Sequence, residues 1–202
     1  MTVGGDLFFS LPVLSQRRED DLLDIAIVKL NENVTEHLLK NGNEFLDLSQ
    51  LRTIPHLSKG DRLLIAGYPA SKTKIDLKNN CVEFNPLMVT TIPYLKRRTI
   101  KNFNKEFHHF AEFPINSFKE ISTGQRMRAA KPHGISGSGL WLFTNGNDGY
   151  PAPILIGILS EYHENNAAVI STKIDFFIDL LRQRFDPSIQ HDGIKVDLEY
   201  KN

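Results

Sequence analysis

Short apolar runs separated by turn residues dominate this chain and limit the folds it can adopt. The runs have strand length and are rich in aliphatic, β-branched or aromatic side chains; they lie at residues 7–11, 25–30, 62–68, 82–84, 87–92, 139–143, 154–159 and 168–171. The sequence Gly-Asn-Asp-Gly at 146–149 predicts a hairpin turn between two of them. Strands that follow one another in this way favour a β-barrel or sandwich over βαβ units.

Helical spacing is clear only near the end of the chain. Apolar residues recur at helical intervals over 174–181, with Asp175 early and Arg182 late, as the helix dipole favours. Residues 34–39 allow one helical turn, whereas the aromatic-rich stretch 103–118 has no clear period and predicts neither element.

Charge and cysteine content narrow the classes of protein that fit. The 202 residues carry 24 Lys and Arg against 24 Asp and Glu, so no net charge favours nucleic acid or an anionic membrane as partner. Cys81 is the only cysteine and excludes an intrachain disulfide, which suggests a reducing compartment. We find no signal-peptide pattern and no run long enough to span a bilayer, and therefore expect a cytoplasmic protein.

The serine-containing loop at residues 134–139 (GISGSG) carries the strongest chemical signal. Acyl transfer by serine needs a hydroxyl on a sharp turn beside backbone N–H groups that can bind an oxyanion. Glycines permit such a turn, and the strand-like residues after it would anchor the loop. Gly-Ser clusters also occur in ordinary turns. The Gly-x-Ser-x-Gly elbow of α/β hydrolases does not fit, because Ser138 replaces its second glycine and a strand rather than a helix follows.

A second stretch, residues 24–30 (DIAIVKL), lies upstream of the serine loop. Together the two resemble the chymotrypsin/trypsin-like serine peptidase family, in which an Asp-Ile-Ala strand carries the triad aspartate and a Gly-x-Ser-Gly loop carries the nucleophile. Residues 64–69 (LIAGYP) are similar to the first strand of that family's second barrel, and residues 157–160 (GILS) to its substrate-binding strand. The matches occur in the family's order and span about residues 7–185.

The resemblance implies an all-β fold: a chymotrypsin-like double β-barrel with a partial first barrel, a complete second barrel and a C-terminal helix. The expected units are a remnant of the first barrel at 1–50, a connector at 51–60, the second barrel at 61–172, the helix at 173–185 and a polar tail at 186–202.

The resemblance also implies roles for individual residues. Ser136 would be the nucleophile, and Asp24 would orient the general base. The N–H groups of Gly134 and Ser136 would form the oxyanion hole. The substrate cleft would be lined by Ala130, Ser160, Glu161 and Tyr162. Ala130 corresponds to the base of the specificity pocket and argues against a preference for Arg or Lys, although Glu161 leaves specificity open.

The general base is missing from its expected place. The family order is His, Asp, Ser, yet no histidine precedes Asp24, and the first in the chain is His37. His133 lies too close to Ser136 in sequence to face it. His108 and His109 are adjacent, so strand alternation would point them to opposite faces. His37, His56, His163 and His191 lie in polar or loop surroundings and are expected to be solvated.

Two functions of different classes follow. The favoured one is a serine endopeptidase that acts on polypeptides through an acyl-enzyme on Ser136, with its histidine supplied by sequence upstream of Met1 and the 202-residue chain inactive alone. The alternative is an inactive pseudo-peptidase that binds peptides. We expect no cofactor, because the sequence has no metal-ligand spacing and no phosphate-binding glycine loop. The sequence does not indicate an oligomeric state.

Overall fold

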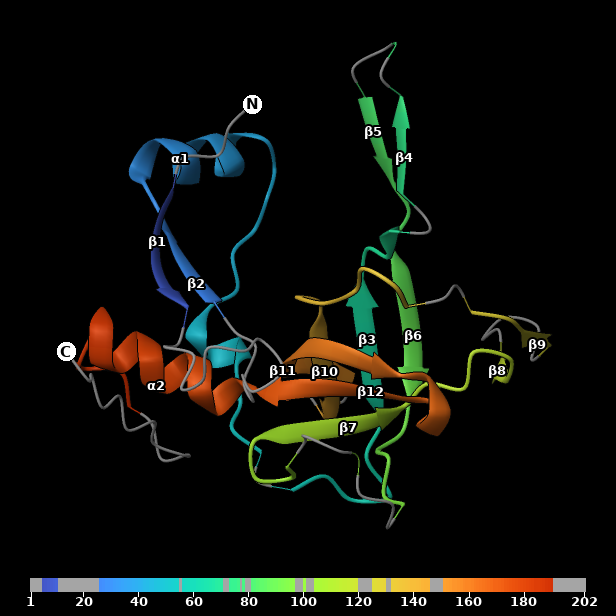
Figure 1. The fold of residues 1–202 in the computed structure, drawn as a ribbon. Coiled ribbons are helices and arrows are strands. Elements are labelled where there is room, and N and C mark those ends of the chain that lie inside the picture. The colour runs from blue at the N-terminus through green and yellow to red at the C-terminus, as the bar shows by residue number, and fades with distance from the viewer. Residues whose placement is uncertain are drawn as a thin grey trace.

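The computed structural model describes residues 5–10, 26–54, 56–70, 73–76, 78, 81–96, 100, 104–119, 125–129, 132–145 and 151–190 (Figure 1). Asp24, Ala130, His191 and the predicted turn at 146–149 lie outside these residues.

An antiparallel sheet of six strands forms the main body of the molecule (Figure 1). Its strands, in sheet order, are β6 (Leu87–Thr91), β3 (Leu63–Gly67), β10 (Gly139–Asn145), β11 (Pro151–His163), β12 (Ala168–Lys173) and β7 (His108–Glu112). Every neighbouring pair is antiparallel. The predicted predominance of β-structure is confirmed, and the strands of this sheet are antiparallel.

The sheet curls until its two edge strands meet. Beyond the end of β6, the N–H of Tyr94 donates to the carbonyl of Phe110 at 2.9 Å, and the N–H of Glu112 donates to the carbonyl of Ile92 at 2.9 Å. The chain after β6 therefore pairs with β7 and leaves the sheet barrel-like. Strands β10, β3, β6 and β7 have the spatial order 4-1-2-3 of a Greek key.

Strand alternation fills the inside of the curl with apolar side chains. In β6, buried Leu87, Val89 and Thr91 alternate with exposed residues, as expected of a strand with one wet face. The cluster inside the curl consists of Leu63, Ile65, Leu87, Val89, Ala111, Phe113, Phe118, Ala129, Ile135, Leu140, Leu142, Ile156, Leu159 and Val169. One member, Ile135, comes from the predicted serine loop.

Strand β7 lies within the stretch 103–118 whose sequence predicted no element. Its first four residues are all buried, since a second apolar cluster with Tyr94, Ile100 and Ile170 covers the outer side of Phe110. A strand covered on both faces shows no period of two in its sequence. This burial explains why the sequence pattern did not reveal β7.

Two short hairpins extend from the sheet, and a helix packs against it. β4 (Thr73–Asp76) pairs with β5 (Cys81–Phe84) in a hairpin that projects from the body, and β8 (Phe118–Lys119) pairs with β9 (Arg126–Met127) (Figure 1). Helix α2 (Ile174–Arg184) lies where the helical spacing predicted a helix and packs Ile174 and Ile178 against Leu155.

The N-terminal part has secondary structure, but none of its residues with a defined exposure is buried. β1 (Gly5–Ser10) pairs with β2 (Ala26–Leu30), followed by α1 (Glu32–Lys40) and the 3₁₀ turn η2 (Leu48–Gln50). None of the residues 27–54 and 56–62, the described residues of that stretch with a defined exposure, is buried. Large apolar side chains there are about half exposed: Val28, Leu39, Phe45, Leu46 and Leu48.

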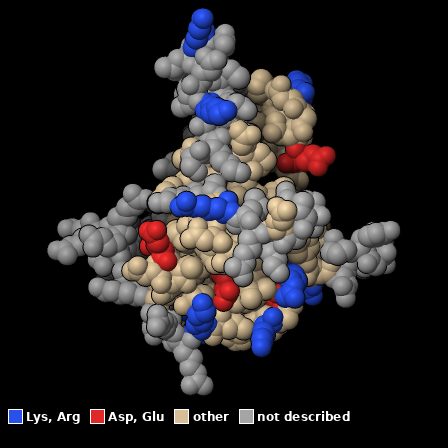
Figure 2. All heavy atoms as spheres, turned by 90° about the vertical axis from the view of Figure 1, so that its right-hand side faces the viewer, with Lys and Arg blue, Asp and Glu red and all other residues tan. Residues whose placement is uncertain are grey.

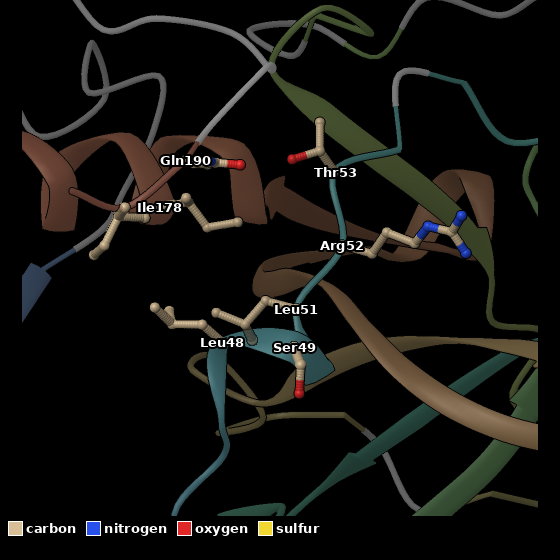
Figure 3. Close-up of a pocket in the computed structure, with 8 residues that line it drawn as sticks. Leu48, Ser49, Leu51, Arg52, Thr53, Ile178 and Gln190 are labelled. Atoms are coloured by element: carbon tan, nitrogen blue, oxygen red, sulfur yellow. The ribbon is translucent and has the colours of Figure 1, made fainter.

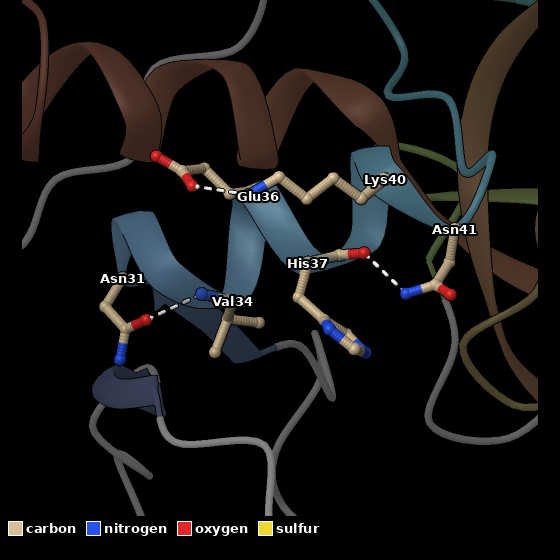
Figure 4. A network of polar contacts seen from close by, with 6 residues as sticks. All are labelled: Asn31, Val34, Glu36, His37, Lys40 and Asn41. Atoms are coloured by element: carbon tan, nitrogen blue, oxygen red, sulfur yellow. Dashed lines mark hydrogen bonds and ion pairs between the residues drawn. The ribbon is translucent and has the colours of Figure 1, made fainter.

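Helix α1 depends instead on polar contacts at its ends and along its surface (Figure 4). Asn31 caps its start, where the side-chain Oδ1 accepts from the N–H of Val34 at 2.9 Å. Glu36 and Lys40 form an ion pair of 3.2 Å one turn apart, and Asn41 donates to the carbonyl of His37 at 2.7 Å. The helix is longer than the single turn that the sequence allowed at 34–39.

No helix in the described part of the chain has the length and apolar character needed to cross a bilayer. Acidic and basic side chains are interspersed on the face that Figure 2 shows.

Candidate active site

The serine loop is a tight turn whose shape depends on two glycines. Gly134 and Gly137 have φ angles of +79° and +87°, in the left-handed region that favours glycine. The N–H of Ile135 donates to the carbonyl of Pro132 at 3.3 Å, and the N–H of Ser138 donates to that of Ile135 at 2.9 Å. Because the Ile135 side chain is buried in the core, the turn is fixed to the sheet while Ser136 remains exposed.

Three hydrogen bonds tie this loop to β11. The hydroxyl of Ser136 donates to the carbonyl of Ser160 at 2.8 Å. The carbonyl of Leu159 accepts from the N–H of Gly137, and the N–H of Leu159 donates to the carbonyl of Ser138, both at 2.8 Å. The predicted nucleophile and the predicted substrate strand thus lie together, although they are far apart in sequence.

Ser160 lies at an irregularity of β11. The register with β12 shifts between Leu159 and Glu161, so Ser160 occupies a β-bulge, a feature common beside functional sites. Its side-chain hydroxyl donates to the carbonyl of Ile170 at 3.3 Å, which holds the bulged residue against β12. The bulge turns the Ser160 carbonyl toward the serine loop, where it accepts from Ser136.

Two N–H groups of the loop are available to a ligand. Among the described residues, neither the N–H of Gly134 nor that of Ser136 donates a hydrogen bond, and both residues are exposed. They flank the Ser136 hydroxyl within one turn. Unoccupied N–H groups beside a hydroxyl can stabilise negative charge on a carbonyl oxygen attacked by that hydroxyl.

The serine loop occupies the edge of β11 at Leu159 and Ser160, directly past the pairing of β11 with β10. Pairing with β10 ends at Ile158, and no described strand continues along that edge past the serine loop. Glu161 is exposed, whereas Tyr162 is partly buried, with its ring edge-on to Phe113 at a centroid distance of 5.7 Å. Burial raises the pKa of the Tyr162 hydroxyl, and nearby Glu164 adds to the shift.

Two of the predicted site residues cannot be placed. Asp24 and Ala130 lie outside the described residues, although Asp24 comes two positions before β2 in sequence. No described histidine forms a hydrogen bond with Ser136. His133 is exposed, and its carbonyl accepts from the N–H of Ala70 at 2.9 Å, so its backbone helps to hold the loop.

The outcome for the other histidines is mixed. His37 and His56 are exposed, as expected. His163 was expected to be solvated, but it is half-buried, and its Nδ1 is buried without a hydrogen-bond partner among the described residues. A 3₁₀ segment, Glu164–Asn166, begins directly after it. His108 and His109 are both buried.

Gly67, part of the sequence motif at 64–69, lies directly against the serine loop, where a side chain would not fit. A Cβ at Gly67 would lie 1.8 Å from the Ser138 hydroxyl and 2.5 Å from the Ser138 Cβ. Ala70, three residues further on, also lies close to the loop, since a Cβ at Gly134 would be 2.7 Å from that of Ala70. The serine loop therefore packs against the end of β3 and the residues that follow it, as well as against β11.

Replacing Gly134 by alanine is expected to destabilise the protein more than the same change at Gly137. Both substitutions place a side chain at positive φ, which costs about 1–2 kcal/mol. Only the Gly134 Cβ meets a neighbour, because nothing lies within 4 Å of a Cβ at Gly137. Urea unfolding of the two variants measures the difference, and equal losses would contradict the contact with Ala70.

A cavity of about 550 Å³ lies away from the serine loop, between the connector at 51–60 and α2 (Figure 3). Leu51, Arg52 and Thr53 line it from the connector and Ile178 from α2, with Gln190 beyond the helix. The Arg52 N–H donates to the carbonyl of Leu155 at 3.0 Å and holds the connector to β11. This cavity contains none of the predicted site residues.

No three His, Cys, Asp or Glu side chains in the described ranges are placed to hold a metal ion together. Comparisons of the chain with protein-family models, with curated proteins and with solved structures found no match.

Proposed function

We propose that the chain is part of a trypsin-like serine endopeptidase that cleaves polypeptides through an acyl-enzyme on Ser136. One observation carries the proposal: the Ser136 hydroxyl lies on a glycine-dependent turn that is bonded to the edge of β11, and the N–H groups of Gly134 and Ser136 in that turn donate to no described residue. A hydroxyl, an oxyanion site and a place for substrate backbone are the parts that acyl transfer needs.

The chemistry proceeds in two halves. A general base removes the proton of the Ser136 hydroxyl while its oxygen attacks the peptide carbonyl carbon, and the N–H groups of Gly134 and Ser136 bind the resulting oxyanion. The C–N bond then breaks as the protonated base gives its proton to the amine, leaving an acyl ester on Ser136. Water activated by the same base hydrolyses this ester and restores the serine.

In this proposal the base is a histidine from outside the 202 residues, and Asp24 orients it. The barrel-like sheet corresponds to the second barrel of a chymotrypsin-like double barrel, and residues 1–50 to part of the first. The absence of any buried residue between 27 and 62, among those described, supports this division, because a partial barrel would have no closed core.

Covalent labelling tests the assignment of the nucleophile. The chain is expressed with the in-frame coding sequence upstream of Met1 and treated with a fluorophosphonate, which reacts with activated serines. We expect labelling that is lost in Ser136→Ala and retained in Ser138→Ala, a matched change two residues away in the same loop. Equal labelling of wild type and Ser136→Ala would exclude Ser136, and an upstream sequence closed by stop codons would remove the proposed source of the base.

A peptide-binding module without catalysis is the second candidate. It is favoured by the hydrogen bond of Ser136 to a backbone carbonyl rather than to a base. Under this function the 202-residue chain alone binds extended peptides along β11 and is never labelled. Peptide-induced NMR shifts at Glu161 and Tyr162 without labelling of the extended protein would establish it over the peptidase.

A further inference from the structure

The cavity of about 550 Å³ beside α2 has an apolar lining that the described residues only partly cover. Leu51, Ile178 and Ile189 line it and belong to the apolar cluster between α2 and the sheet. Leu48 lines it from η2 and is 46% exposed. Figure 3 shows Leu48 and Leu51 on one side of the space and Ile178 on the other. Concave sites lined mainly by apolar side chains are the usual places for apolar groups to bind.

The chain returns to this cavity after the end of α2. The N–H of Ile189 donates to the carbonyl of Asp186 at 3.2 Å, which closes a β-turn with Pro187 at its second position, where proline is favoured. The N–H of Ser188 donates to Oδ1 of Asp186 at 3.0 Å and strengthens the turn. Ile189 and Gln190, the next residues, both line the cavity. The chain therefore leaves the described residues at the cavity wall.

Residues 191–202 (HDGIKVDLEYKN) lie outside the described residues, but their sequence has a regular pattern. The apolar residues Ile194, Val196, Leu198 and Tyr200 alternate with charged residues. Alternate side chains of an extended chain lie on one face, so this sequence favours a strand with one apolar and one charged face. The tail that we expected to be polar is therefore amphipathic in sequence, and its apolar face needs a surface to cover.

We propose that residues 194–200 dock in this cavity of their own chain as an extended segment, with their apolar face against Leu48, Leu51 and Ile178. Only residues 191–193, which include Gly193, separate the segment from Gln190 on the cavity wall. A short flexible link of this kind gives an effective concentration in the millimolar range, which favours the chain's own segment over that of a second copy.

The docked segment would join two parts of the molecule that the described contacts connect sparsely. One wall of the cavity comes from η2 and the connector, and the other from α2 and the turn after it. The segment would contact both walls and cover Leu48. The contact is separate from the proposed peptidase chemistry, because the serine loop contributes no residue to the cavity.

Disulfide trapping in the full 202-residue chain tests the contact directly. Cys81 is the only cysteine, so Cys81→Ser removes the background thiol. Leu48→Cys is then combined, in separate variants, with Ile194→Cys, Val196→Cys or Leu198→Cys. A disulfide needs Cα atoms about 4.4–6.8 Å apart and side chains that point toward each other. We expect at least one of the three pairs to form an intramolecular disulfide in a glutathione buffer.

The charged face of the segment provides the matched control. Leu48→Cys paired with Lys195→Cys or with Asp197→Cys should form the disulfide at least about tenfold more slowly than the best apolar-face pair, because these side chains point away from the cavity. Equal rates for the two faces would overturn the proposal, as would the absence of a disulfide in all three apolar-face pairs. A disulfide that links two chains and depends on protein concentration would overturn it in favour of a second copy.

Stability provides a second measurement that needs no introduced thiol. Val196→Ser and Leu198→Ser should lower the urea midpoint recorded by Trp141 fluorescence, because Trp141 packs in the same apolar cluster as the cavity lining. Lys195→Ser, on the charged face, should leave the midpoint unchanged. Unchanged midpoints in both apolar-face variants would contradict docking. None of these outcomes depends on labelling of Ser136, so the proposed peptidase function and the docked segment can fail separately.

Discussion

Gly67→Ala should displace the serine loop and destabilise the protein, and Ser138→Gly should largely restore both. A methyl group at Gly67 would overlap the Ser138 hydroxyl at 1.8 Å and its Cβ at 2.5 Å, distances that require a shift of one segment. Overpacking of this kind costs about 1–3 kcal/mol or more. The Cα of Ser138 is 3.7 Å away, an ordinary contact, so a glycine at 138 removes the overlap.

A double-mutant cycle measures this coupling. Urea unfolding followed by the fluorescence of Trp141, the only tryptophan, gives the free energies of unfolding. We expect the double variant to be more stable than Gly67→Ala alone, with a coupling energy above about 1 kcal/mol. In the extended protein, fluorophosphonate labelling should fall in the single variant and recover in the double variant. If the losses in free energy of unfolding are additive, residues 67 and 138 are not in steric contact.

Acid should destabilise the protein through His109. In the unfolded chain this imidazole takes up a proton near pH 6.5, whereas in the folded protein its pKa is about 3. Below pH 6.5 the unfolded state therefore binds one more proton than the folded state, and stability falls as the pH drops. The loss is about 1.4 kcal/mol for each pH unit between the two pKa values and about 4 kcal/mol by pH 3, below which it levels off.

The difference between wild type and His109→Phe isolates this effect from the titration of carboxylates. Phenylalanine has a similar shape and no proton to gain, so its stability should fall less steeply between pH 6.5 and about 3. His37→Phe, at an exposed position on α1, should follow the wild-type curve. Parallel curves for wild type and His109→Phe would mean that His109 is not buried as a neutral ring.

Sequence patterns predicted most strands of the sheet, including β12, which is buried along its whole length, but they did not predict β7. β6 alternates buried and exposed residues, and its run was evident. β7 is buried on both sides, so its histidines and aromatic residues gave no period. The length of β11 was also underestimated, since it continues past the bulge at Ser160 to His163.

The serine loop could be located from sequence because its turn needs residues at positive φ, and the glycines that provide them, Gly134 and Gly137, are visible beside Ser136 in the sequence. Its tertiary partners could not. The hydrogen bond of Ser136 to Ser160 joins segments that are far apart in sequence and meet only in the folded sheet. The close approach of Gly67 to Ser138 is likewise visible only in the atomic distances.

The absence of buried residues from 27 to 62, among those described, has a consequence for how the molecule unfolds. Segments with few buried contacts exchange their amide hydrogens through local fluctuations, whereas a closed sheet exchanges through global unfolding. The amides of α1 should therefore exchange far faster than those of β3 or β12. Trp141 belongs to the sheet, so its fluorescence reports the cooperative unit alone. A melting curve recorded by Trp141 fluorescence would therefore report the unfolding of the sheet and not that of α1.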